Sequence, residues 1–149
     1  MQGEGSYYVI GHLTRMTGLS DRTIRSYLAS GLLQGEKING VWHFTPQQVE
    51  EFIRHPAVRP SIRAKSNAIV YDFLLSNRKA EAELCVILDA PRADRKALAE
   101  FFSYRISGED YRNIEFSFDG VGKEPRVIIR GRAPDVLALM NRYSAEHPL

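Results

Sequence analysis

The Asn-Gly pair at positions 39 and 40 constrains the fold more than any other feature of this chain. Asn39 and Gly40 both tolerate positive φ, and such a pair is the strongest short-range signal for a β-hairpin. Trp42 and Phe44 follow at alternate positions and favour a strand. Because helical patterns stand on both sides of the pair, residues 9–53 predict a small unit of helices around one hairpin.

The first helix of this unit is expected near Ile10. Ile10, Leu13 and Met16 are spaced three apart, which places them on one face of a helix. Gly18 then allows the left-handed backbone that ends a helix in a sharp turn. A tight turn therefore leads directly into the next helix.

The second helix is expected to begin at a cap formed by Ser20 or Asp21, whose oxygens accept the free N–H groups of the first turn. Gly31 ends this helix. Its inward stripe is Ile24, Tyr27 and Leu28. Four polar residues lie on or beside its outward face, near the N-terminal end: Arg22, Thr23, Arg25 and Ser26.

The third helix follows the hairpin. Thr45 can cap it, and Pro46 suits its first position because no N–H is needed there. Val49, Phe52 and Ile53 keep helical spacing, so this helix is expected to pack on the first two. Small domains with two such helices and a hairpin present side chains to a DNA groove, and the N-terminal end of the second helix touches base edges.

These residues resemble the winged helix-turn-helix of MerR-type transcriptional regulators. The resemblance rests on Ile10-Gly11-His12-Leu13-Thr14-Arg15-Met16-Thr17-Gly18-Leu19-Ser20, Thr23-Ile24-Arg25-Ser26-Tyr27 and Gly31-Leu32-Leu33. The next segment, Gly40-Val41-Trp42-His43-Phe44-Thr45, is more similar to the wing of the excisionase-like branch of that superfamily. The resemblance covers roughly the first third of the chain.

The resemblance implies that double-stranded DNA is the partner and that the second helix faces bases or phosphates. It also implies that Tyr27 approaches the DNA backbone and that the wing adds phosphate or minor-groove contacts. The DNA-binding residues expected on this basis are Arg15, Arg22, Thr23, Arg25, Ser26, Tyr27, Lys37, Asn39 and His43.

Other interpretations of single residues stay open. Arg22 and Arg25 also suit a solvated surface, although arginine is the usual reader of guanine edges. Tyr27 suits either the core or a phosphate contact. Trp42 is expected in the core, because hairpins use aromatic residues to pack. Two histidines are expected at the surface: His12 and His55.

The charge distribution agrees with a DNA-binding N-terminal part. The chain has 149 residues and a net charge of +2, so it is not a polybasic protein. Residues 1–66 hold eight Lys and Arg against five Asp and Glu, whereas residues 67–149 hold twelve against thirteen. This excess favours the release of DNA counterions. It is small, however, and therefore predicts a dimer on a two-part site.

Cysteine usage and hydropathy exclude several classes of protein. The single cysteine excludes an internal disulfide and a cysteine-based zinc site. Cys85 lies in an apolar stretch and is interpreted as a small buried residue, with redox sensing as the less favoured alternative. No signal segment and no membrane-spanning run is found, so a cytoplasmic protein is expected.

A boundary is expected at Pro56 and Pro60, which end one helix and set up the next. The predicted parts are a winged helix-turn-helix domain over residues 1–57, a linker or dimerisation helix over residues 58–79, and an α/β dimerisation or sensing domain over residues 80–149.

The linker helix carries more apolar surface than a lone helix should expose. Ile62, Ile69, Phe73 and Leu74 form one stripe. The MerR resemblance implies that this helix pairs with its twin in a second subunit. The alternative is that it packs on the C-terminal domain of its own chain.

The C-terminal domain is predicted to contain three strands. Residues 82–88 form a strand that is apolar on both faces and therefore well covered. Ile114, Phe116 and Phe118 alternate with polar residues, as in a half-buried strand. Residues 119–123 turn the chain, and residues 126–130 return it.

Two helices complete that domain. The first runs from about Asp94 to Tyr104, with Leu98, Phe101 and Phe102 inward. Pro134 opens the last helix, whose apolar residues are Val136, Leu137, Met140 and Tyr143.

The whole chain is therefore expected to be an α+β protein with an N-terminal winged helix-turn-helix, a linker helix and a C-terminal β-α-β-β-α domain. That domain is weakly similar to a ferredoxin-like fold that stops before its fourth strand. A right-handed crossover gives a three-stranded sheet ordered first, third, second, with its helices on one face.

The first strand of this sheet would have an open edge. It is also the most apolar strand of the chain, which makes it a poor edge to leave in water. The strand, Leu84-Cys85-Val86-Ile87-Leu88, is therefore expected to pair with its own copy in a homodimer or to lie under the linker helix.

A ligand site on the sheet is a further hypothesis. Arg126, Arg130 and Arg132 share one face of the last strand and would suit an anionic ligand. Cross-strand ion pairs are the favoured alternative. Phe116 and Ile128 would suit an apolar pocket instead.

The residues do not suggest an enzyme. No Ser-His-Asp or Cys-His set, phosphate-binding glycine loop or metal-ligand spacing is found, so no cofactor or metal is expected. The function expected is a dimeric transcriptional regulator with a small-molecule or protein effector. The alternatives are an excisionase-like DNA-bending factor and a winged helix that docks on protein.

Overall fold

The computed structural model describes residues 7–76, 79–107, 111, 113–119 and 125–147. Its N-terminal part holds α1 (Ile10–Thr17), α2 (Asp21–Ser30), β1 (Glu36–Ile38), β2 (Val41–His43) and α3 (Pro46–Arg54). A long helix, α4 (Arg59–Leu75), follows. The C-terminal part holds β3 (Glu83–Asp89), α5 (Arg95–Ser107), β4 (Glu115–Asp119), β5 (Arg126–Arg132) and α6 (Ala133–Glu146). The predicted α+β class and the order of its elements are confirmed.

Local signals define the N-terminal elements as predicted. The Ser20 hydroxyl accepts the Thr23 N–H at 3.1 Å and caps α2. Gly18 takes φ 79° at the end of α1. Asn39 and Gly40 take φ 52° and 81° between β1 and β2, so the predicted hairpin turn has positive φ at both central residues.

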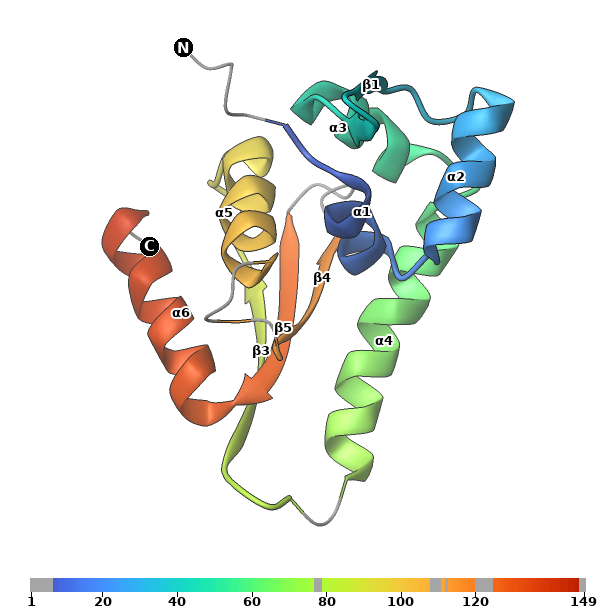
Figure 1. Cartoon of the computed structure of the whole chain (residues 1–149). Helices are drawn as coiled ribbons and strands as arrows, with labels where there is room; N and C mark the ends of the chain where they lie inside the picture. Colours follow the sequence, from blue (N-terminus) through green and yellow to red (C-terminus); the bar gives the residue numbers. More distant parts are fainter. Residues whose placement is uncertain (1–6, 77–78, 108–110, 112, 120–124, 148–149) are drawn as a thin grey trace.

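The C-terminal sheet has the strand order β3-β5-β4, and both of its pairings are antiparallel. This is the predicted order of first, third and second strand. In Figure 1, α5 and α6 lie on one side of this sheet and α4 lies on the other.

Side chains from the two faces identify these layers. Ser117 of β4 pairs with Ile128 of β5, and its hydroxyl lies 2.5 Å from the Ser66 hydroxyl of α4. The next residue along, Phe116, faces the opposite way, and its ring centre lies 6.3 Å from that of Phe102 in α5. The sheet is therefore the middle of three layers, between α4 and the pair α5 and α6.

The expectation of a half-buried strand at residues 114–118 holds for Glu115, which is exposed, but is wrong for Ser117. Phe116 and Phe118 are buried, but Ser117 on the other face is also fully buried. The reason is that α4 packs on β4 and β5 and covers the face that the alternating pattern assigned to solvent.

The expectation of a well-covered strand at residues 82–88 is also wrong. β3 is an edge strand of the sheet, and its residues are only partly buried. Ile87 is 52% exposed. Cys85 is half-buried, and desolvation raises the pKa of its thiol. α4 lies over β4 and β5 instead of this edge, so no described element covers the outer side of β3.

Helix α4 joins the N-terminal part to the sheet. The Ser61 hydroxyl donates to the Thr17 carbonyl at 2.7 Å, and the Lys65 ammonium donates to the Arg15 carbonyl. Both carbonyls belong to the last turn of α1, where a positive charge is favourable. Burial lowers the pKa of Lys65 to about 8. Because α4 also contacts β4 and β5, the linker helix packs on the C-terminal domain of its own chain, as one of the two alternatives expected.

Helix α1 also packs directly against α5 and β4 (Figure 1). The Arg15 guanidinium donates to the Ile106 carbonyl at 2.9 Å, and the Tyr104 hydroxyl donates to the Tyr7 carbonyl. As a result, buried residues of both parts form one hydrophobic cluster.

The expectation of a surface position for His12 is wrong. Its ring lies 5.2 Å from that of Tyr104, and its Nδ1 accepts the Val9 N–H at 2.9 Å. Burial, together with the nearby charge of Arg15, lowers the pKa of His12 to about 4. The α1–α5 packing explains this burial. His55 is half-buried at the end of α3, where its Nδ1 accepts the Ala57 N–H.

Some apolar residues point away from the faces predicted for them. Leu74 and Leu75, at the end of α4, are 68% and 70% exposed, whereas the buried residues of this helix are Ile62, Ser66 and Ile69. Leu137 is exposed, and Leu139 takes the buried place in α6. The turn expected at residues 119–123 lies, apart from Asp119, outside the described residues.

Candidate nucleic-acid interface

The N-terminal end of α2 presents a polar face to solvent. Arg22, Arg25 and Ser26 are exposed, whereas Ile24 between them is fully buried. This pattern follows from the helical period, which directs the apolar residues at α1 and α3 and leaves the intervening ones outside.

The two arginines of this face differ in their surroundings. Arg25 contacts the Asp21 carboxylate at 2.5 Å, one turn earlier on the same helix. The side chains are 56% and 59% exposed, so the ion pair is weak and exchanges readily for other partners. Arg22 has no ion-pair or hydrogen-bond partner among the described residues.

Two other predicted residues of α2 have structural contacts. The Thr23 hydroxyl lies 3.0 Å from that of Ser20, within the N-terminal cap. The Tyr27 ring meets the Phe52 ring of α3 edge-on, with centres 6.0 Å apart, and Tyr27 is half-buried. Tyr27 thus contributes to packing between α2 and α3.

The hairpin places its predicted residues in different environments. Asn39 is exposed at the turn. The Lys37 ammonium lies 5.9 Å from the centre of the Trp42 ring, and Trp42 packs on the core as expected. The His43 ring stacks on that of Tyr7, with centres 4.0 Å apart and planes within 8°.

Arg15 is separated from this group. It lies between α1 and α5, half-buried, and its guanidinium is engaged by the Ile106 carbonyl. Among the predicted DNA-binding residues it is the one that the structure places against the C-terminal part.

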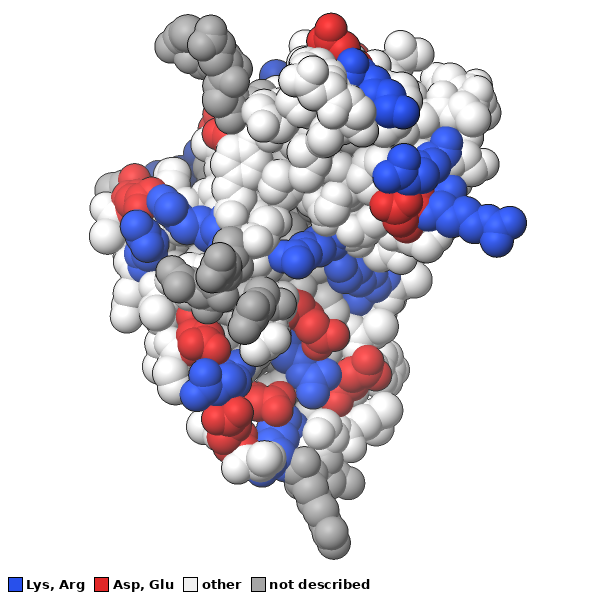
Figure 2. Space-filling model, in the orientation of Figure 1, with Lys and Arg blue, Asp and Glu red and all other residues white. Residues whose placement is uncertain are grey.

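The charges divide the molecule into two regions. Figure 2 shows blue side chains around a red patch over α2, where blue predominates, whereas red and blue alternate over the lower half. That lower half contains the sheet, whose arginines are paired with carboxylates. The basic surface therefore coincides with the exposed face of α2.

Sequence reasoning missed a basic groove where α3 meets α4. The groove has a volume of about 600 Å³, and its charged lining consists of Arg54, Arg59 and Arg63. Arg59 and Arg63 are four apart in α4 and thus share one face of the helix. This spacing was the signal that could have revealed them.

Residues 8–54 match the family model of the MerR HTH family regulatory protein. The N-terminal part is a MerR-type helix-turn-helix. The match begins at Tyr8, whose backbone pairs with Phe44 after the hairpin, and it ends at Arg54, the last residue of α3. The matched segment is therefore the whole unit of three helices and a hairpin. No curated protein and no solved structure matches the chain.

A MerR-type helix-turn-helix is the DNA-binding part of transcriptional regulators, a generally non-enzymatic class. In this protein its α2 carries the exposed basic face, and its α1 is fixed to the C-terminal domain. The sequence resemblance thus identified the MerR-type helix-turn-helix correctly. The packing of its first helix against α5 was not predicted.

The three arginines of the C-terminal sheet form ion pairs. Arg126 contacts Asp89 through two bonds of 2.6 and 3.0 Å, which lower the pKa of that carboxyl. Arg130 lies 3.4 Å from Glu83 and 3.6 Å from Glu115. Arg132 lies 3.1 Å from Glu81 and 3.4 Å from Asp135. The structure therefore has the ion pairs that the sequence offered as the alternative to an anion site.

Two further properties bear on function. Within the described ranges, no group of three or more His, Cys, Asp and Glu side chains has the arrangement of a metal site. In the same part of the chain, no helix combines the length and apolar character needed to span a membrane.

Proposed function

We propose that the protein is a dimeric, non-enzymatic transcriptional regulator that reads a two-fold symmetric DNA site. The observation that carries this proposal is the coincidence of the MerR-type match with an exposed basic face on α2. Arg22 and Arg25 would contact base edges or phosphates in the major groove, as the N-terminal residues of a recognition helix do.

The hairpin would act as a wing that steadies the DNA backbone. Asn39 at its turn and Lys37 beside it are both exposed, and His43 offers part of its ring. The arginine groove at the α3–α4 junction would add phosphate contacts, which raise affinity without selecting sequence.

Dimerisation is supported by the open edge of the sheet. β3 has seven residues and, among the described residues, pairs with β5 alone, so one side of its backbone is free to extend the sheet. Such an edge is usually covered or blocked in a monomer. Ile87 on β3 and the α4 residues Tyr71, Leu74 and Leu75 are also exposed. We infer that this surface, which we call the β3 edge, joins two copies.

Sedimentation equilibrium tests the dimer. Ile87→Lys should convert the protein to a monomer and lower its affinity for a symmetric site by at least tenfold, because the second reader is no longer tethered. Leu137→Lys is the matched control, since Leu137 is 53% exposed on α6 and lies outside the β3 edge. A wild-type monomer, or an Ile87→Lys dimer, would reject this interface.

A further inference from the structure

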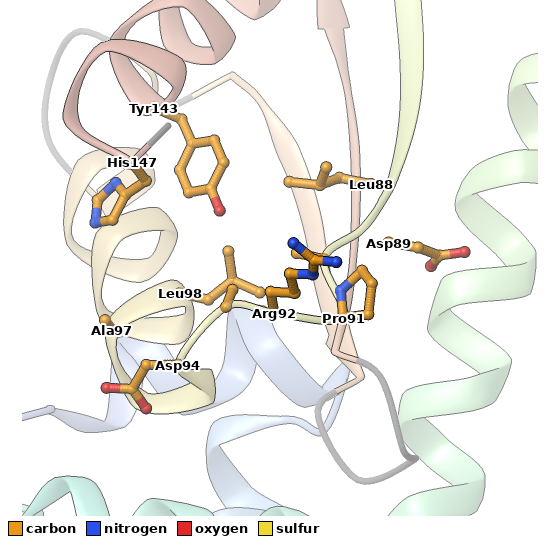
Figure 3. A pocket seen from close by; sticks show the side chains of 11 residues that line it. Leu88, Asp89, Pro91, Arg92, Asp94, Ala97, Leu98, Tyr143 and His147 are labelled. Carbon is orange, nitrogen blue, oxygen red and sulfur yellow. The ribbon is translucent and has the colours of Figure 1, made fainter. Parts of the chain in front are cut away.

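A cavity of about 510 Å³ opens in the C-terminal domain, far along the chain from the MerR-type segment. It lies between the end of β3, the loop that follows, α5 and α6 (Figure 3). Pockets for small molecules have volumes of roughly 300–1,000 Å³. The walls are mainly apolar and consist of Leu88, Ala90, Pro91, Ala93, Ala97 and Leu98.

Two polar side chains, Tyr143 and His147, stand at the wall of this cavity, and the Nδ1 of His147 is buried without a hydrogen-bond partner among the described residues. Tyr143 is only 3% exposed, and its ring is packed by Phe101, Phe102 and His147. Its hydroxyl has no hydrogen-bond partner among the described residues, and Figure 3 shows it pointing into the cavity. Burial raises the pKa of Tyr143, so the hydroxyl keeps its proton and can donate. The hydroxyl is thus a donor that a ligand in the cavity can reach, and a ligand oxygen would supply the hydrogen-bond partner that the protein does not.

The charged residues of the cavity are not equally available. Asp89 is held by Arg126, and one oxygen of Asp94 accepts the Lys96 N–H at 3.2 Å at the start of α5. Arg92 has no ion-pair or hydrogen-bond partner among the residues that the structure describes. In Figure 3 its guanidinium extends toward the space beside Leu88 that the Tyr143 hydroxyl also faces. Asp94 keeps its negative charge, but in Figure 3 its carboxylate points away from the Tyr143 hydroxyl, so Arg92 is the charged group that faces the space beside that hydroxyl.

We propose that this cavity binds a small amphipathic carboxylate. The Arg92 guanidinium and the Tyr143 hydroxyl hold the carboxylate, and the apolar walls enclose its hydrocarbon body. An arginine and a hydroxyl donor are both suited to a carboxylate, whereas neither favours a cation.

Helix α5 connects this cavity to the DNA reader. Ala97 and Leu98 line the cavity, and Arg95, next to them, contacts Glu50 of α3 at 2.6 Å. Farther along α5, the Ile106 carbonyl accepts the Arg15 guanidinium of α1. A ligand that moves α5 therefore moves contacts with both α1 and α3. This second step, in which the carboxylate alters DNA affinity, rests on the proposed function.

Calorimetric titration of the full chain without DNA tests the site. Octanoate, octan-1-ol and octylammonium share one hydrocarbon body and differ in charge. We expect saturable binding of octanoate and no binding of octylammonium. Arg92→Gln should weaken octanoate about tenfold and leave octan-1-ol unchanged, and Tyr143→Phe should weaken octanoate while keeping the ring packing.

Two further variants complete this test. Arg142→Gln removes the same charge from α6 outside the cavity and should bind octanoate like the wild type. Ala97→Phe fills the cavity and should abolish binding of both octanoate and octan-1-ol. The site is overturned if octanoate does not bind saturably, if octylammonium binds equally well, or if Ala97→Phe has no effect.

The coupling has a separate readout. Octanoate should change the affinity of the wild type for its DNA site by at least fivefold, whereas Glu50→Gln should still bind octanoate but show a smaller change. Octanoate binding with no change in DNA affinity would overturn the coupling and support the site. A protein that binds octanoate but no DNA would overturn the proposed function and again support the site.

Discussion

Arg25 is the residue for which a contact with a DNA base is proposed most specifically. Its exposed pair with Asp21 keeps the guanidinium beside the N-terminal end of α2 without burying it. A weak pair of this kind is easily exchanged for a base edge or a phosphate. Arg22 has no acidic partner among the described residues, so no ion pair competes with a DNA contact of its guanidinium.

Replacing Arg25 by alanine should weaken specific DNA binding by about 1–3 kcal/mol and relax base preference at one position. Fluorescence anisotropy with matched and mismatched duplexes measures both effects. Arg142→Ala is the control, because Arg142 is 52% exposed and also has an acidic partner four residues away. An equal loss on every duplex would make Arg25 a phosphate contact.

His12 makes the stability of the folded protein depend on pH. Its pKa is about 4 in the folded protein, mainly because of burial, against 6.5 for the free side chain. The unfolded chain therefore binds the proton more tightly between these values, and the folded state loses stability as the pH falls from about 6.5 to 4. The loss is at most about 3 kcal/mol by linkage, and smaller because the ring is only partly buried.

His12→Gln should remove most of this loss. Urea unfolding at pH 7 and pH 4.5 measures it as a smaller difference in the free energy of unfolding than in the wild type. The same pH dependence in both proteins would contradict a lowered pKa of His12 in the folded state.

At the scale of elements, local signals were enough for the helices and the hairpin. Ser20, Gly18 and Asn39-Gly40 act through their own backbone and nearest neighbours, so their effects could be predicted from sequence. The burial of Ser117 could not be predicted from sequence, because it depends on packing by α4, and Ser66 of that helix lies about fifty residues earlier in the chain. A polar residue in an alternating strand predicts solvent unless the covering element is known.

The Ser66–Ser117 pair joins α4 to the sheet and should show coupling. Ser117→Ala leaves the buried Ser66 hydroxyl without this partner and should cost about 1–3 kcal/mol. Ser66→Ala with Ser117→Ala removes both hydroxyls and should cost less than the sum of the single changes. Urea unfolding of the four proteins tests this, and strictly additive losses would rule out the bond.

At the scale of the whole molecule, the separate parts predicted from sequence share one core. Tyr104 and Ile106 of α5 hold Tyr7 and Arg15, and α4 contacts both α1 and the sheet. Sequence placed Arg15 among the DNA-binding residues of the MerR-type motif and His12 at the surface. Their burial depends on α5, and no local pattern reports a contact made ninety residues later.

A shared core predicts a single unfolding transition. Trp42, the one tryptophan of the chain, reports on the hairpin by fluorescence, and circular dichroism reports on all helices and strands. Their urea midpoints should coincide, and Ser117→Ala should lower both together. Earlier unfolding at Trp42 would instead mean that the reader is an independent domain.

We propose that this chain is a sequence-specific, dimeric DNA-binding protein. Selection from a random DNA pool, with the bound complexes sized at two salt concentrations, tests it most directly. We predict a two-fold symmetric motif, bound by a dimer, whose affinity falls steeply with salt. Absence of both enrichment and salt-dependent binding would contradict the claim and would leave the exposed face of α2 to a protein partner.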